Sequence, residues 1–249
     1  MASAADVAIA DLEDAVAPAE KPAARELLRG LRPPAIRVNG VDTEWFAEDL
    51  ALVEELGPEI VVLPKATPDA VAALGEDGPP VIAIAETAQG VRQAYELAAA
   101  PRVEALLIGA VDLGAEIGLE PRRDGLELLY VRSKLVVDSA AAGIRSPFDV
   151  VHLEVRDEAG LEEECRLARS LGLRGKACIH PAQVAVVNRA FAPTDAEAEW
   201  AREVVEAFEA EVEAGRGVFA LGGTMVDLPV VERARRVLAD VERRDAGEH

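Results

Sequence analysis

The sequence predicts an α/β fold of the TIM (β/α)8 barrel type, and three observations support this prediction. The chain has 249 residues, which is within the usual size of a single barrel. Short β-branched runs alternate with longer stretches of helical spacing, a pattern typical of βα units around a parallel sheet. Nearly every β-branched run also ends in charged or polar residues, as strands do at the active-site edge of a barrel enzyme.

The β-branched runs predict seven strands rather than eight, at 7–11, 35–38, 60–63, 81–85, 105–108, 150–155 and 175–179. Apolar residues at helical spacing predict the intervening helices, at about 18–30, 43–56, 68–75, 88–99, 124–142, 157–171 and 182–190. We expect residues 1–190 to form the barrel.

The remaining residues, 191–249, are expected to form a C-terminal helical extension. Acidic and basic residues alternate there with apolar ones at helical spacing, which predicts helices at about 195–214 and 229–243. The segment between them contains Gly222 and Gly223, and we expect a loop or arm that leads to the last helix.

Composition excludes several classes of partner. Half of the residues are hydrophobic but only 4% are aromatic, so Val, Leu, Ile and Ala must fill the core. The net charge of −20 would repel nucleic acids and anionic membranes, and no apolar run approaches the ~20 residues that span a bilayer. Cys165 and Cys178 lack the spacing of metal ligands, so we expect reduced, buried thiols in a cytoplasmic protein.

The polar residues at the ends of the predicted strands are candidates for a site. They are Asp11, Glu13, Asp14, Arg37, Asn39, Lys65, Glu86, Asp112 and His180. All strands of a parallel barrel point the same way, so these side chains should converge on one rim.

Glu86 and Asp112 follow successive strands and have no Cys or His beside them, which suits Mg²⁺ or Mn²⁺. On spacing alone another interpretation is equally good: Glu86 caps the following helix and Asp112 pairs with a cation. Thr87 is a further candidate for that helix cap.

Seven segments, in order along almost the whole chain, make the sequence resemble the citrate lyase β-subunit-like branch of the HpcH/HpaI aldolase family. They are Asp-Leu-Glu-Asp-Ala-Val at 11–16, Arg-Val-Asn at 37–39, Leu-Pro-Lys at 63–65, Glu-Thr-Ala-Gln-Gly-Val at 86–91, Gly-Ala-Val-Asp-Leu at 109–113, Gly-Lys-Ala-Cys-Ile-His-Pro-Ala-Gln at 175–183 and Gly-Thr-Met-Val-Asp-Leu-Pro at 223–229. Members of this family cleave or form β-hydroxyacyl-CoA thioesters. They usually have another strand before the Asp-Leu-Glu-Asp segment, so the resemblance implies a barrel that lacks its first strand.

The resemblance implies roles for individual residues. Glu86 and Asp112 would bind Mg²⁺, and Arg37 would clamp a substrate carboxylate by paired hydrogen bonds; its alternative is a salt bridge with Glu13 or Asp11. Asp11, Glu13 and Asp14 would orient Arg37 or bind metal waters, Glu13 being the best candidate. Lys65 would contact a substrate phosphate or carboxylate, or else pair with a neighbouring strand end. For His180 we favour a structural hydrogen bond over acid–base chemistry.

Asp227 is implied to act on a neighbouring subunit. In relatives the Asp of this segment lies on a C-terminal arm that covers the neighbour's site, and it would move the substrate hydroxyl proton. The chain would then be a homo-oligomer, a trimer or a dimer of trimers. The alternative is that Asp227 is a carboxylate at a helix N-terminus, where the helix dipole favours it.

The resulting hypothesis is a Mg²⁺-dependent carbon–carbon lyase. It would split a β-hydroxyacyl-CoA such as malyl-CoA or citramalyl-CoA into an α-keto acid and an acyl-CoA, or run in reverse. Alternatives are a citrate lyase β-subunit that acts on an acyl-carrier-protein thioester, a malyl-CoA-type thioesterase, and an inactive barrel retained as an interaction protein.

Overall fold

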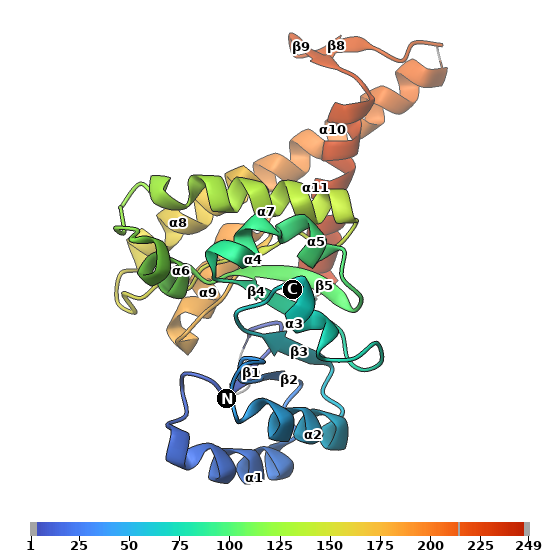
Figure 1. Cartoon of the computed structure of the whole chain (residues 1–249). Coiled ribbons are helices and arrows are strands. Elements are labelled where there is room, and N and C mark those ends of the chain that lie inside the picture. Colours follow the sequence, from blue (N-terminus) through green and yellow to red (C-terminus); the bar gives the residue numbers. More distant parts are fainter. Residues whose placement is uncertain (1–3, 214, 247–249) are drawn as a thin grey trace. The chain divides into compact units, whose positions relative to one another are not determined.

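The computed structural model describes residues 4–213 and 215–246. Across these residues the chain divides into two compact units, Met1–Ala190 and Phe191–His249 (Figure 1).

Within the described part of the first unit, seven strands form a curled parallel sheet of the TIM-barrel type (Figure 1). The strands are β1 (Ile9–Asp11), β2 (Ala35–Arg37), β3 (Ile60–Leu63), β4 (Val81–Ala85), β5 (Val103–Ile108), β6 (Phe148–Asp149) and β7 (Gly175–Lys176). Strands that follow one another in the chain pair with one another, in the order β1-β2-β3-β4-β5-β6-β7. All carboxyl ends therefore lie at one edge, as the sequence predicts. An eight-stranded barrel that lacks its first strand stays a prediction.

Helices join the strands, and most begin and end at recognisable signals. They are α1 (Lys21–Leu31), α2 (Phe46–Leu56), α3 (Pro68–Ala72), α4 (Ala88–Arg92), α5 (Ala94–Ala98), α6 (Ala110–Ile117), α7 (Leu129–Ala142), α8 (Glu158–Leu171) and α9 (Pro181–Phe191). Short 3-10 turns, Pro18–Glu20 and Leu126–Leu128, precede α1 and α7. The hydroxyl of Thr67 caps α3, and left-handed glycines such as Gly57 and Gly172 end α2 and α8.

The core of the first unit is aliphatic, as the low aromatic content predicts. Strand residues such as Ile36, Val61 and Leu106 have no exposed surface, and neither do Leu97 of α5 and Leu135 of α7. Burial of such side chains is the main term that stabilises the sheet against its helices.

The strand predicted at 150–155 is wrong, because the strand that forms is Phe148–Asp149. Phe148 pairs with Leu107 on one side and Gly175 on the other. The carboxylate of Asp149 is fully buried in the sheet, which its sequence position does not suggest. β7 also ends at Lys176, three residues earlier than predicted.

The second unit contains α10 (Asp195–Glu213), β8 (Phe219–Leu221), β9 (Thr224–Val226) and α11 (Leu228–Ala246). The loop predicted between the two helices is wrong in part, because β8 and β9 pair as an antiparallel hairpin. Gly222 and Gly223 form its turn with φ values of 56° and 81°, a conformation that side chains other than glycine rarely adopt.

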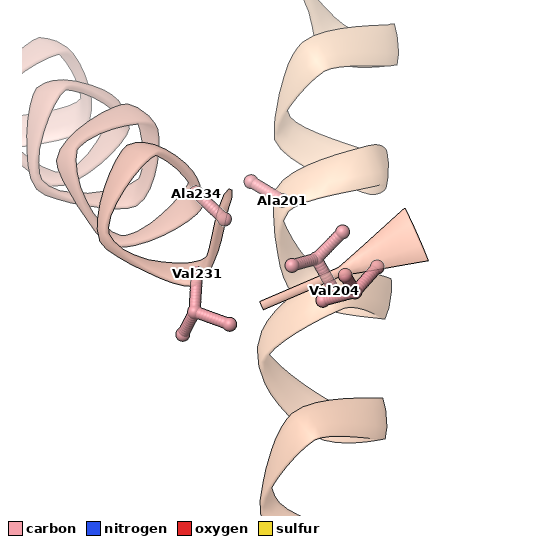
Figure 2. Close-up of a cluster of buried hydrophobic side chains, with 5 residues drawn as sticks. Ala201, Val204, Val231 and Ala234 are labelled. Atoms are coloured by element: carbon pink, nitrogen blue, oxygen red, sulfur yellow. The ribbon is translucent and has the colours of Figure 1, made fainter. Parts of the chain in front are cut away.

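Small residues let α10 and α11 pack closely. Figure 2 shows Ala201 and Val204 of α10 facing Val231 and Ala234 of α11. Their apolar cluster also includes Val226 of β9, so the hairpin is anchored to the helix pair at its base.

No helix in the described ranges 4–213 and 215–246 is long and apolar enough to cross a membrane. Both cysteines are free; Cys165 is buried and Cys178 half-buried. Burial raises the pKa of the Cys165 thiol to about 12, so this thiol stays protonated.

Candidate active site at the carboxyl edge of the sheet

Consecutive strands place the candidate residues at one edge of the sheet. Asp11 and Arg37 end β1 and β2, Lys65 lies two residues after β3, and Glu86 directly follows β4. Asp112 lies in the first turn of α6, which begins at Ala110, just after β5.

Arg37 is held by three carboxylates. Its Nε and Nη2 donate to the two oxygens of Asp11 at 2.7 and 2.6 Å. Its Nη1 lies 2.9 Å from Oε2 of Glu13, and its Nη2 lies 3.4 Å from Oδ2 of Asp14. The salt bridge proposed as the alternative role of Arg37 therefore exists, and it fixes the plane of the guanidinium.

The ionisation of this cluster follows from its contacts. Burial lowers the pKa of Arg37, but the hydrogen bonds and charge of Asp11, with the charges of Glu13 and Asp14, raise it above its ordinary value. Burial raises the pKa of Asp11, and the hydrogen bond and charge of Arg37 outweigh that effect and lower it. Both groups are thus charged near neutral pH.

Lys65 reaches across to three acidic residues. Its Nζ donates to Oε1 of Glu13 at 2.8 Å and lies 4.0 Å from Oε1 of Glu86 and 4.0 Å from Oδ2 of Asp112. Burial lowers the pKa of Lys65, but Glu13 and the other two carboxylates raise it overall, so the ammonium stays charged. The ion pair proposed as the alternative role of Lys65 is therefore present.

The main chain at Lys65 has an unusual conformation. Its φ is 48°, in the left-handed region, and its N–H donates to Oε1 of Glu86 at 2.7 Å. The next N–H, that of Ala66, donates to the carbonyl of Ile84 in β4 at 3.0 Å. The end of β3 is thus bonded to the end of β4, and strained backbone of this kind is common in functional sites.

Glu86 is an almost fully buried carboxylate, 3% exposed. Burial raises the pKa of Glu86 to about 7, and the charges of Glu13 and Asp112 add to this effect. Gly109 leaves the space that the Glu86 side chain fills. Such a carboxylate is poorly solvated, so a cation beside it is strongly favoured.

The donor set fits a hard divalent cation. Glu86 and Asp112 each place an oxygen 4.0 Å from the same ammonium nitrogen, so both carboxylates approach one cation. The part of the chain that the structure describes contains no cluster of three or more His, Cys, Asp or Glu side chains arranged for a metal. Two carboxylates would leave the remaining positions to water and substrate, which is how Mg²⁺ is commonly bound.

The sequence also allows Glu86 to cap a helix and Asp112 to pair with a cation, and the structure bears on both alternatives. Thr87, not Glu86, caps α4, because its hydroxyl accepts the N–H of Gly90 at 2.9 Å. Asp112 does have a cation, Lys65, at the limit of ion-pair distance.

His180 and Asp227 lie at helix N-termini. Nδ1 of the exposed His180 accepts the N–H of Ala182 at 3.1 Å in the first turn of α9. Asp227 belongs to the second unit, where its carbonyl accepts the N–H groups of Val230 and Val231 at the start of α11. Its Oδ1 lies 3.4 Å from the N–H of Val230.

Sequence reasoning missed a buried ionic network behind β6 and β7. Asp149 accepts from Nε and Nη2 of Arg132 at 2.8 and 3.2 Å and from Nζ of Lys176 at 2.9 Å. Lys176 also lies 2.9 Å from Glu164 of α8, whose other oxygen is 3.0 Å from Nδ1 of His152. The sequence feature that could have revealed this network is the charged residue inside each short strand, Asp149 in β6 and Lys176 in β7.

Lys21 is a second feature that the sequence does not reveal, and it supports the segment that carries Glu13. Lys21 is 3% exposed, and its Nζ donates to the carbonyls of Leu12 at 2.7 Å and Glu13 at 3.0 Å. The ammonium also lies 4.7 Å from the ring centroid of Trp45. These contacts fix the backbone from which Glu13 reaches Arg37 and Lys65.

Comparison with known proteins gives a consistent picture. The family model described as HpcH/HpaI aldolase/citrate lyase matches residues 1–181. The chain is 40% identical over 251 residues to a (3S)-malyl-CoA thioesterase of Cereibacter sphaeroides, covering 96% of this chain and 87% of the relative. It is 41% identical over 247 residues to a citrate lyase subunit beta-like protein of Mycobacterium tuberculosis, covering 95% and 88%.

A solved structure is similar as well. The protein CitE of Mycobacterium tuberculosis, in complex with magnesium, acetoacetate and coenzyme A, matches with a TM-score of 0.86 and 40% identity. The match covers 96% of this chain and 91% of that chain.

Proposed function

Because the chain belongs to the HpcH/HpaI aldolase/citrate lyase family, we propose that it is a Mg²⁺-dependent enzyme that acts on a β-hydroxyacyl-CoA thioester. The proposed reaction splits a substrate such as malyl-CoA or citramalyl-CoA into an α-keto acid and an acyl-CoA. The supporting observation is that a charged Arg37 and the carboxylates Glu86 and Asp112 lie at one edge of the sheet. A cation and a guanidinium together can hold the carboxylate and hydroxyl of one small hydroxy acid.

Glu86 and Asp112 are the proposed ligands of Mg²⁺. When bound, the ion supplies a Lewis acid for the substrate hydroxyl oxygen on which the carbonyl forms. Glu86 must lose its proton to act as a ligand, which its pKa of about 7 permits in neutral solution. A relative with magnesium and coenzyme A bound in its structure supports the same assignment.

Arg37 is proposed to bind the substrate carboxylate. Asp11 takes the Nε position and one Nη2 position of the guanidinium. Oε2 of Glu13 lies 2.9 Å from Nη1 as an ion pair without a hydrogen bond, and Asp14 approaches Nη2 at 3.4 Å. Because a guanidinium has five N–H groups, one at Nη1 and the weakly held one at Nη2 remain for substrate. Release of the exposed Asp14 would free this pair without disturbing the Asp11 bond.

The bond cleavage needs a group that accepts the hydroxyl proton. We assign this role to Asp227 of a neighbouring subunit, with the second unit as the arm that carries it. As the proton leaves, the bond between the hydroxyl-bearing Cβ and Cα breaks. Its electron pair moves onto Cα to form the thioester enolate, and protonation at Cα yields the acyl-CoA. This assignment requires a homo-oligomer, proposed to be a trimer or a dimer of trimers.

Thioester hydrolysis is a second candidate function. The (3S)-malyl-CoA thioesterase of Cereibacter sphaeroides is 40% identical along nearly the whole chain. The same site could bind malyl-CoA and direct water at the thioester carbonyl, which would release free malate and coenzyme A.

Product analysis with the full-length protein tests both functions. Purified protein is incubated with Mg²⁺ and malyl-CoA or citramalyl-CoA, and keto acid and free hydroxy acid are quantified. Keto acid release that is lost with EDTA and in Glu86→Ala supports the lyase, while free malate supports the thioesterase. Glu26→Ala on the exposed face of α1 is the matched control. Activity that survives in Glu86→Ala would refute the metal assignment.

A further inference from the structure

The ammonium of Lys65 lies among three carboxylates, Glu13, Glu86 and Asp112, two of which are the proposed ligands of a divalent cation. Its Nζ lies 2.8 Å from Glu13, 4.0 Å from Glu86 and 4.0 Å from Asp112. The Lys65 side chain is 48% exposed and that of Glu86 only 4%, so the ammonium lies on the solvent side of the buried carboxylate.

The main chain holds Lys65 in this position. The left-handed φ of 48° turns the chain sharply after β3, and the N–H bond to Glu86 at 2.7 Å locks that turn. A side chain other than glycine is strained at this φ, so a lysine here comes at a cost in stability. One residue therefore contacts Glu86 twice, through its N–H and through its ammonium.

An ammonium and a metal ion compete for the same oxygens. Glu86 Oε1 and Asp112 Oδ2 are equidistant from Nζ, and both belong to carboxylates that the proposed function assigns to Mg²⁺. Two cations cannot both lie against this pair without mutual repulsion. The shorter bond to Glu13 gives Lys65 a partner that is not a proposed ligand.

We propose that Lys65 is a positioning residue that sets the divalent-cation affinity of this site. Without metal, its ammonium keeps the oxygens of Glu86 and Asp112 directed at one point and limits their mutual repulsion. With metal, it retains Glu13 and opposes the bound charge, so the ion is held less tightly than the two carboxylates alone would hold it. This inference rests on the proposed metal centre.

Direct binding of Mn²⁺ tests the inference without an activity assay. Mn²⁺ is titrated into the full-length wild type and Lys65→Met by isothermal titration calorimetry and by electron paramagnetic resonance of free Mn²⁺. The pH is 8, above the pKa of about 7 at Glu86. Methionine keeps an unbranched side chain of similar length, so the backbone strain is unchanged. We expect Lys65→Met to bind Mn²⁺ about tenfold more tightly, since it loses one nearby positive charge.

Three controls separate charge from structure. Lys65→Arg keeps the charge and should stay near the wild-type affinity, and Lys65→Gln should follow Lys65→Met. Lys134→Met removes a lysine of α7 that pairs with Asp138 and should leave the affinity unchanged. Circular dichroism verifies that each variant is folded.

The outcomes are distinguishable. Equal or weaker Mn²⁺ binding in both folded neutral variants would overturn the role of Lys65 while leaving the metal centre intact. Failure of the wild type to bind Mn²⁺ would refute the metal centre of the proposed function, and the inference with it.

Discussion

Gly109 and Glu86 share one space at the carboxyl ends of β4 and β5. A β-carbon added at Gly109 would lie 2.5 Å from Oε2 of Glu86 and closer still to its Cβ. The Glu86 carboxylate therefore depends on the absence of a side chain one strand away.

Gly109→Ala should displace Glu86 and weaken metal binding. Because the clash is with a proposed metal ligand, we expect turnover to fall at least about 100-fold, in line with the cost of misplacing a group by about 1 Å. Gly114→Ala in α6 is the control, since a β-carbon there meets Leu119 at an ordinary 3.7 Å. Mn²⁺ titration and turnover are measured for both; wild-type values for Gly109→Ala would contradict the dependence.

The stability of the metal-free protein should fall as pH rises towards 7. The pKa of Glu86 in the folded state, about 7, is above its ordinary value of 4.5, because of burial and then the charges of Glu13 and Asp112. Between these values the folded state binds a proton that the unfolded state has lost, so stability decreases with pH across this window and stays lower above it. Glu86→Gln removes this penalty and should be more stable than wild type by about 1–3 kcal/mol at pH 8.

Urea unfolding in EDTA at pH 5 and pH 8 measures this effect. The gain from Glu86→Gln should shrink at pH 5 and reverse at pH 8 when Mg²⁺ is added. A gain that is independent of pH would contradict the raised pKa.

Loss of Asp149 should destabilise the first unit. Asp149→Asn leaves Arg132 without its buried counter-charge and Lys176 with Glu164 alone. Breaking a buried pair in this way costs about 3–5 kcal/mol, which chemical denaturation can measure. Asp124→Asn breaks the exposed pair with Arg122 and should leave the unfolding midpoint in place. Equal midpoints for the two variants would contradict a stabilising role for the network.

Lys21→Met should weaken both stability and the site. Two hydrogen bonds to the carbonyls of Leu12 and Glu13 are lost in a buried position, a cost of about 1–3 kcal/mol. The same backbone carries Glu13, so turnover should fall about tenfold, in kcat more than in KM. Arg29→Met on the exposed side of α1 should change neither quantity. Normal turnover in a destabilised Lys21→Met would show that the contact serves only the fold.

Two inactive variants should complement each other if the sites are shared. Arg37→Ala removes the proposed carboxylate clamp of the first unit, and Asp227→Asn the proposed proton acceptor of the second. Mixed oligomers from co-expression should regain activity, because some sites combine an intact Arg37 with an intact Asp227. Turnover of the co-purified mixture is compared with that of each variant alone. If the oligomers are shown to contain both variants and are still inactive, the result would argue for sites within one chain.

The strands that sequence predicts well are those whose burial is purely apolar. Ile60–Leu63 and Val81–Ala85 form as predicted because both are β-branched runs with clear boundaries: prolines lie on both sides of the first and directly before the second. β6 was placed too late because its buried Asp149 depends on Arg132 and Lys176, which lie 17 and 27 residues away in sequence. A local pattern cannot display such partners.

Three further elements, α6, β8 and β9, give weak signals in the sequence. The residue before α6 is Gly109, which has no side chain to cap a helix, so the helix start at Ala110 was missed. β8 and β9 have three residues each, too few for a clear alternating pattern, although Gly222 and Gly223 between them are typical of a hairpin turn.

The sequence predicts which residues come together in the site, but not the contacts that they make there. Parallel strands dictate that Asp11, Arg37, Lys65 and Glu86 come together, and they do. The backbone N–H of Lys65 donates to Glu86 because Lys65 has a left-handed φ. A lysine in a sequence does not predict that conformation. The role of Asp227 stays a prediction.

The sequential order of the strands also suggests how the first unit is assembled during synthesis. Every sheet neighbour is the preceding or following strand, so the sheet can grow by one βα unit at a time as the chain leaves the ribosome. Asp149 and Arg132 can pair as soon as β6 has been synthesised and has joined the sheet, whereas Lys176 joins the sheet only with β7. A nascent chain that stalls before residue 176 would thus leave the Asp149 carboxylate with only one of its two cationic partners, Arg132.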